Sequence, residues 1–97
     1  MKKIHLGIQL VPLEHGRQSW QLIDRFIEHI RSTGNRFEVS PLETIIECSF
    51  EEGMNMIRWC YDLMESEFKG DYLLYTRMHA HTLATVSWNE KTLHRKS

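Results

Sequence analysis

Side chains that could bind a small ligand are spread along the 97-residue chain. Carboxylate and amide groups can pair with the donors and acceptors of a polar ligand, and hydroxyl groups can do both. Aromatic rings offer flat apolar faces that attract planar groups and cations. We expect the binding residues to be Gln9, Glu43, Thr44, Glu47, Trp20 and Tyr75.

Each of these residues also has an explanation without a ligand. Glu47 could form a cross-strand pair with Arg77 instead. Thr44 could bond backbone groups near a turn, and Trp20 could cover the core at the start of a helix. Gln9 lies on a strand expected at the centre of the sheet, where an uncharged polar side chain needs a partner. Gln9 is therefore the side chain that we would substitute first.

The sequence offers little for catalysis, for a metal ion or for a phosphate group. His79 and His81 lie two residues apart, but a third and a fourth metal ligand are not evident. The five glycines are isolated and form no phosphate-binding loop. Cys48 and Cys60 lie in no motif that would activate a thiol. We expect no catalytic residue, no metal and no cofactor.

Composition and charge narrow the class of protein further. Hydrophobic residues make up 41% and charged residues 26% of the chain, as in soluble globular domains. The net charge of -1 provides no basic field for nucleic acid or for an anionic membrane surface. The first apolar run is short and is interrupted by His5 and Gln9, which argues against a signal peptide or a membrane span. We expect one cytoplasmic domain over residues 1–97, with a core over 3–80 and a tail over 81–97.

Hydrophobic periodicity predicts six elements in the order βαββαβ. The alternation of apolar and polar residues predicts strands over residues 3–11, 36–40, 43–48 and 71–80. Apolar stripes at helical spacing predict helices over residues 18–33 and from Ser49 to near Gly70. Ser49 and Glu52 have the spacing of a capping box, and Pro12 is expected to end the first strand.

This order predicts an α+β, ferredoxin-like domain, with a four-stranded antiparallel sheet and two helices on one face. The opposite face would then remain uncovered by helices. Its apolar residues are expected to be Ile45, Val11 and either Leu73 with Tyr75 or Tyr72 with Leu74. Because an apolar patch of this kind usually marks an interface, we expect this face to stack on a second chain, to line a ligand pocket, or both.

A further pattern lies in the centre of the chain, at Gly34, Phe37, Glu38, Pro41, Thr44 and Glu47. The order of a Gly, an aromatic residue with Glu, a Pro and then Thr-x-Ile-Glu resembles the YkoF-like thiamine-binding protein family. The resemblance covers residues 4 to about 80. The chain departs from the family pattern at Leu42, where a Met is common, and at Cys48, where a Gly is common. The tail after His79 also lacks the basic and acidic run of the short members.

The resemblance implies a domain that assembles into dimers or tetramers through its sheets and that carries out no reaction. It also implies binding of thiamine or its hydroxymethylpyrimidine part, in connection with uptake or salvage. The aminopyrimidine edge and the thiazolium cation of thiamine suit the carboxylate, amide and aromatic groups named above. Two alternatives stay open by analogy with the fold: a small cofactor-free enzyme on a dimeric ferredoxin-like barrel, and an amino-acid-sensing regulatory domain.

Overall fold

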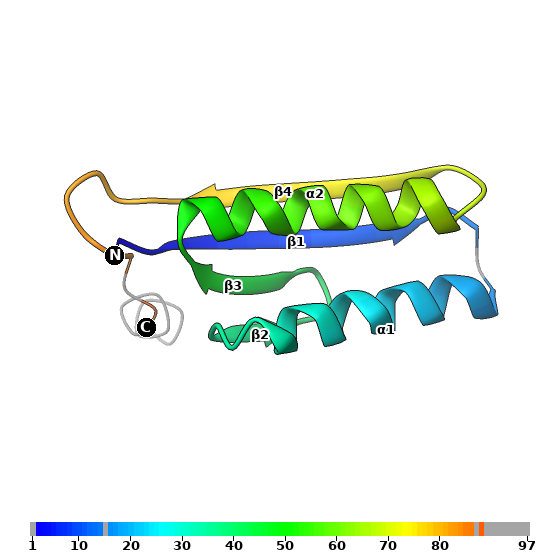
Figure 1. Ribbon diagram of the computed structural model, residues 1–97, viewed down its shortest axis with the longest axis horizontal. Helices are drawn as coiled ribbons and strands as arrows, with labels where there is room; N and C mark the ends of the chain where they lie inside the picture. The colour runs from blue at the N-terminus through cyan, green and yellow to red at the C-terminus, as the bar shows by residue number, and fades with distance from the viewer. Residues whose placement is uncertain (1, 15, 87, 89–97) are drawn as a thin grey trace.

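The computed structural model describes residues 2–14, 16–86 and 88, and it contains the predicted elements in the predicted order (Figure 1). The elements are β1 (Ile4–Pro12), α1 (Arg17–Ser32), β2 (Phe37–Val39), β3 (Thr44–Cys48), α2 (Phe50–Glu67) and β4 (Tyr72–His79). Pro12, which was expected to end the first strand, is its last residue, one position beyond the predicted range, and lies opposite Tyr72. A proline is compatible with the end of a strand, where its missing N–H costs no interior ladder bond.

The four strands form one antiparallel sheet in the order β2-β3-β1-β4, which places β1 at the centre. Both helices cover the same face of this sheet, because their apolar residues share one buried cluster with the inward residues of β1 and β3. In Figure 1 the two helices run alongside the strands on that side. The α+β, ferredoxin-like architecture is therefore confirmed.

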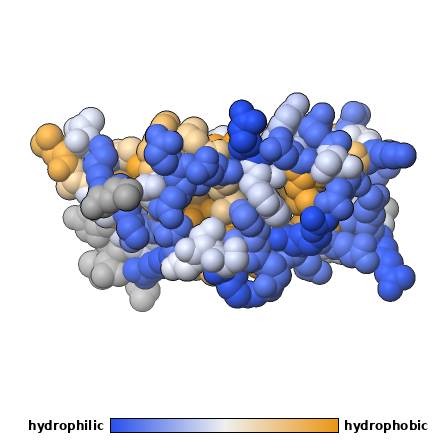
Figure 2. Space-filling view, in the orientation of Figure 1, coloured by the Kyte–Doolittle hydropathy of each residue, from blue (hydrophilic) through white to orange (hydrophobic). Residues whose placement is uncertain are grey.

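The core follows directly from the alternation along β1. Ile4, Leu6, Ile8 and Leu10 point toward the helices and are buried. Burying an Ile or Leu side chain contributes about 1.5–3 kcal/mol relative to leaving it exposed. Figure 2 shows that the outer surface on the helix side is mainly hydrophilic, with apolar residues visible between the polar ones.

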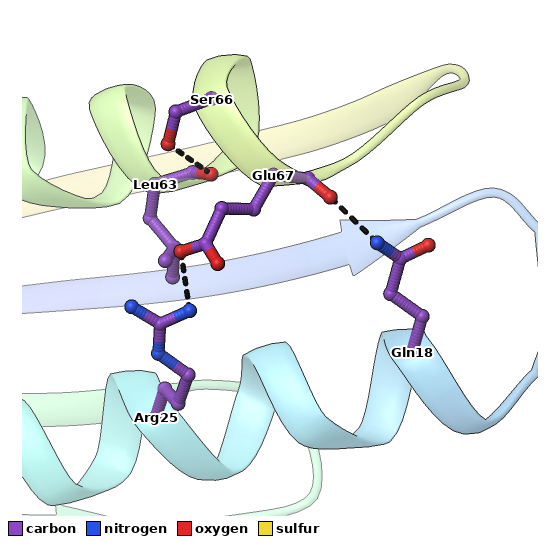
Figure 3. A network of polar contacts seen from close by, with 5 residues as sticks. All are labelled: Gln18, Arg25, Leu63, Ser66 and Glu67. Carbon is purple, nitrogen blue, oxygen red and sulfur yellow. Dashed lines mark hydrogen bonds and ion pairs between the residues drawn. The ribbon is translucent and has the colours of Figure 1, made fainter.

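Local contacts fix the ends of the helices. The predicted capping box is present at α2: the Glu52 backbone N–H donates to the Ser49 hydroxyl, and the Ser49 backbone N–H donates to the Glu52 carboxylate. At the other end of α2, Glu67 pairs with Arg25 of α1 and accepts a bond from Gln18 at its backbone carbonyl (Figure 3). These contacts tie the start of α1 to the end of α2, although exposed ion pairs of this kind contribute little stability.

The chain after β4 returns to the start of β1. The backbone N–H of Val86 donates to the Lys3 carbonyl, and the Lys3 N–H donates to the Thr85 hydroxyl. Val86 is buried there. The rest of the predicted tail, residues 87 and 89–97, lies outside the described residues. In the part of the chain that is described, no helix is long and apolar enough to cross a membrane.

Candidate functional site

The face of the sheet that turns away from the helices carries a mixture of polar and apolar side chains. We call it the open face. The register between the strands determines its members, because residues directly opposite each other point to the same side. The members from β1, β3 and β4 are His5, Gly7, Gln9, Val11, Ile45, Glu47, Leu73, Tyr75, Arg77 and His79. Of the two predicted apolar sets, Leu73 with Tyr75 is therefore the correct one, while Tyr72 and Leu74 face the helices.

A hollow of about 490 Å³ lies over β1, β4 and the turn that leads into β3. We call it the open-face hollow. Its lining consists of Gln9, Leu42, Glu43, Tyr75, Thr76 and Arg77. It brings together three of the six predicted binding residues, one from β1, one from the β2–β3 turn and one from β4.

Glu43 reaches this hollow because a tight turn fixes its backbone. The backbone N–H of Ser40 donates to the Glu43 carbonyl over 3.0 Å, and the Ser40 hydroxyl donates to the same carbonyl over 2.6 Å. The Glu43 N–H donates in return to the Ser40 hydroxyl over 3.2 Å. These three bonds hold the two residues on either side of Pro41 and Leu42, and so they set the direction of the Glu43 side chain.

Gly7 makes room for the Glu43 carboxylate on the surface of the sheet. A Cβ atom at position 7 would lie 2.4 Å from the Glu43 Oε2 atom, which is closer than atoms can approach. We did not identify Gly7 as a site residue from the sequence. The available signal was a glycine inside a strand, which often marks a place where another group approaches the backbone closely.

The polar groups of the open-face hollow keep most of their bonding capacity. The Glu43 carboxylate has one polar contact to a described residue, an Arg77 guanidinium nitrogen at 3.7 Å. Arg77 is 82% exposed, so this contact is weak and its side chain can move away. The side chains of Gln9 and Tyr75 form no hydrogen bond to any residue in the described ranges. A carboxylate, an amide and a phenol ring therefore face one space with groups left to bind a ligand.

The other end of the open face is arranged differently. His5 is only 3% exposed, and its Nε2 atom lies 3.1 Å from a Glu47 carboxylate oxygen. The Trp88 ring packs edge-on against the His5 ring at 5.0 Å, and the Arg36 guanidinium lies over Trp88 at 4.6 Å. We call this group, His5 with Glu47 and Trp88, the covered end. The segment that follows β4 thus covers part of a face that we had expected to be uncovered.

The structure places Glu47 outside the open-face hollow. Glu47 lies opposite His5 in the register, whereas Arg77 lies opposite Gly7, two residues further along β1. This offset explains why Glu47 pairs with His5 while Arg77 approaches Glu43. The cross-strand Glu47–Arg77 pair, which we considered from the sequence, is not formed.

Trp20 and Thr44 lie on the opposite side of the sheet from Gln9 and Tyr75. They line a smaller, largely apolar hollow of about 300 Å³ between α1 and the β2–β3 turn, which we call the helix-side hollow. Thr44 lies opposite Ile8 and is 5% exposed, and Trp20 is 66% exposed. The two hollows have Gln9, Leu42 and Glu43 in common, so they meet at β1 and the β2–β3 turn. The helix-side hollow is thus lined by four of the six predicted binding residues, Gln9, Trp20, Glu43 and Thr44.

Comparisons with known proteins agree with this fold and add a functional context. A family model described as thiamine-binding protein matches residues 6–94. A UPF0045 protein of Clostridium perfringens is 27% identical over 70 residues, which cover 72% of this chain and 74% of that protein.

Solved structures with the same architecture come from several organisms. A Thermotoga maritima protein, described as a candidate thiamine biosynthesis or salvage protein, superposes with a TM-score of 0.78 and 26% identity, covering 96% of this chain and 98% of that one. A domain of unknown function from Bacillus cereus superposes with a TM-score of 0.79 over 93% of this chain and 86% of that one. Its identity of 18% supports the fold alone.

Proposed function

The chain belongs to the thiamine-binding protein family, and from this premise we propose that its open-face hollow binds thiamine or the hydroxymethylpyrimidine part of thiamine. The binding would serve uptake or salvage in the cytoplasm and would involve no chemical step. The observation that carries the proposal is the convergence of three groups with free bonding capacity, those of Gln9, Glu43 and Tyr75, above the gap left by Gly7.

The chemistry of the ligand suits these groups. The exocyclic amino group of the pyrimidine can donate to the Glu43 carboxylate, and a ring nitrogen can accept from the Gln9 amide. A thiazolium cation is favoured beside the negative charge of Glu43 and beside the face of Tyr75. Arg77 would have to turn outward when the cation binds, which its exposure allows.

We also propose that a second copy of the chain covers the uncovered part of the open face. Leu73 and Tyr75 are exposed there, and Val11 and Ile45 are partly exposed beside them. An apolar surface around a ligand site is stabilised when a partner removes it from water. Size-exclusion chromatography with light scattering is expected to show a dimer or a tetramer. A clean monomer at micromolar concentration would contradict this part of the proposal.

Isothermal titration calorimetry with thiamine and with hydroxymethylpyrimidine tests the proposed site. The variants Gln9→Leu and Glu43→Gln are each expected to weaken binding about tenfold, because each removes one hydrogen-bonding or charged group that faces the ligand. Glu38→Gln is the matched control: Glu38 lies on the same face, opposite Ile45, but it does not line the hollow.

The outcomes separate the alternatives. An absence of heat change with both ligands at millimolar concentration would contradict thiamine binding. Unchanged affinity in both variants would contradict the location in the open-face hollow, although thiamine would still be the ligand. Amino acids titrated in the same way address the regulatory alternative, because that function predicts binding of an amino acid and no binding of thiamine.

A further inference from the structure

A third hollow, of about 370 Å³, lies on the helix side of the sheet, away from both hollows described above. We call it the inter-helix hollow. It opens between the C-terminal part of α1 and the N-terminal half of α2. Its floor consists of Ile46, Cys48 and Met56, all buried members of the core. The floor therefore offers an apolar, polarizable surface to a ligand.

One wall of this hollow is a stacked pair of rings. His29 of α1 and Trp59 of α2 lie parallel, with ring centroids 4.0 Å apart and an angle of 3° between the planes. Burial lowers the pKa of His29 below its usual value, which favours the neutral imidazole. A neutral imidazole carries one donor and one acceptor, so this wall is flat, aromatic and uncharged.

The rim provides uncharged hydrogen-bonding groups. The Asn55 side chain lines the hollow and forms no hydrogen bond within the described part of the chain. Asn35 donates to the Glu52 carboxylate over 3.1 Å, which leaves its own carbonyl oxygen to accept another bond. Both Glu52 oxygens are already occupied, one by Asn35 and the other by the Ser49 backbone N–H.

The charge around the inter-helix hollow limits the ligand further. Glu52 is the one charged side chain among the described residues that line it, and no Lys or Arg is present in that lining. A phosphate or carboxylate group would therefore meet a negative charge without a cation to neutralise it. The negative charge of Glu52, without a Lys or Arg in the described lining, therefore favours a ligand that has no anionic group.

We propose that the inter-helix hollow is a second binding site, for an uncharged flat nitrogen heterocycle of the nucleobase class. The ring would pack on the apolar floor against the His29–Trp59 wall, and its amino and ring-nitrogen groups would bond the amides of Asn35 and Asn55. This site is separate from the proposed thiamine site, since the sheet lies between them. Its occupancy is therefore expected to be independent of Gln9 and Glu43.

Nuclear magnetic resonance of the full, ¹⁵N-labelled chain tests the proposal, with adenine and cytosine as probes. We expect saturable shifts of the Trp59 indole N–H and of the Asn35 and Asn55 side-chain amides, without shifts at the Gln9 amide. Adenosine monophosphate, which carries the same ring with a phosphate, is expected to bind more weakly than adenine. Trp59→Leu, which removes the flat wall, is expected to abolish the saturable shifts.

Asn55→Leu is the sharper variant, because it removes one amide from an exposed helical position. It is expected to weaken binding of the probe about fivefold to tenfold, through the loss of one hydrogen bond. Gln21→Leu is the matched control, since it removes an exposed amide from α1 that lies outside this lining. The spectra also report whether each variant remains folded.

Two results would overturn the proposal. One is the absence of saturable shifts at Trp59 with either base at millimolar concentration. The other is an affinity for adenine or cytosine that is the same in wild type, Asn55→Leu and Trp59→Leu. A loss of probe binding in Gln9→Leu would instead place the probe in one of the two hollows that Gln9 lines, and it would overturn the claim of a further site between the helices.

Discussion

The two ends of the open face carry similar side chains but use them differently. At the covered end, His5 is buried and pairs with Glu47, and Trp88 packs against the same imidazole. A few residues away, Gln9 of β1 and Glu43 of the β2–β3 turn face a hollow, and their side chains make almost no bonds to described residues. Both ends thus combine a carboxylate with another polar group, yet one end satisfies them within the chain and the other leaves them free.

The cause of the difference is the path of the chain after β4. Hydrogen bonds from Lys3 and Val86 anchor that segment at the start of β1, which brings Trp88 over His5. Nothing among the described residues covers the other end in the same way. A polar residue on a sheet face therefore becomes structural or ligand-binding according to what covers it, more than according to its type.

The largest expected effect is a difference in stability between two variants, each of which removes a carboxylate from one end of the open face. Glu47→Ala removes a hydrogen-bonding partner of a buried imidazole and is expected to lower the free energy of unfolding by about 1–3 kcal/mol. Glu43→Ala removes a carboxylate whose one described polar contact is a weak ion pair, and we expect a change within about 0.5 kcal/mol. Urea unfolding followed by circular dichroism measures both. Equal losses in the two variants would mean that the two ends do not differ in this way.

The next effect concerns the gap beneath Glu43. Gly7→Ala places a Cβ where the carboxylate oxygen now lies, so the Glu43 side chain must move away. We expect thiamine binding to weaken about tenfold, while the free energy of unfolding changes by less than about 1 kcal/mol. Gly16→Ala is the control, because a Cβ there meets no heavy atom within 4 Å. Calorimetry with undiminished affinity in Gly7→Ala would remove Glu43 from the site.

The fold could be predicted from local patterns because each element depends on residues close in sequence. The alternation along β1, the apolar stripes of the helices and the Ser49–Glu52 capping box each place a boundary without knowledge of the rest. Antiparallel pairing with β1 at the centre then follows from the βαββαβ order.

The site could be predicted only in part, since it depends on contacts between distant residues. The residue types of Gln9, Glu43 and Tyr75 made them candidates, and the structure brings these three to the lining of one hollow. Whether Glu47 meets His5 or Arg77 depends on a register offset of two residues, which no local pattern specifies. The position of Trp88 depends on the path of the chain after β4, which had only weak periodicity to indicate it.

A smaller difference in stability is expected between substitutions of two tryptophans, one at the covered end and one outside it. Trp88→Leu removes ring contacts with His5 and Arg36 and is expected to lower the free energy of unfolding by about 1 kcal/mol. Trp20→Leu changes a ring that is 66% exposed, and we expect a change within about 0.5 kcal/mol. Thiamine affinity is expected to stay the same in both. A weaker affinity in Trp20→Leu would place the ligand in the helix-side hollow.

The smallest expected effect is the reactivity of the two cysteines on the helix-covered side of the sheet. Burial raises the pKa of the Cys48 thiol to about 11 and that of the Cys60 thiol to about 12. At pH 8 the reactive thiolate is then on the order of one thousandth of Cys48 or less, so a thiol reagent such as Ellman's reagent should not label the folded protein. Unfolding in urea should release both thiols.

The same labelling shows whether the covered end protects only the open face. If Trp88 covers His5 and nothing more, Trp88→Leu leaves the packing around both cysteines unchanged and the thiols as unreactive as in the wild type. Labelling of Cys48 before Cys60 in that variant would mean that the segment also stabilises the helix side near β3. The two faces of the sheet would then be coupled through β1, and the contrast between covered and uncovered ends would extend through the whole domain.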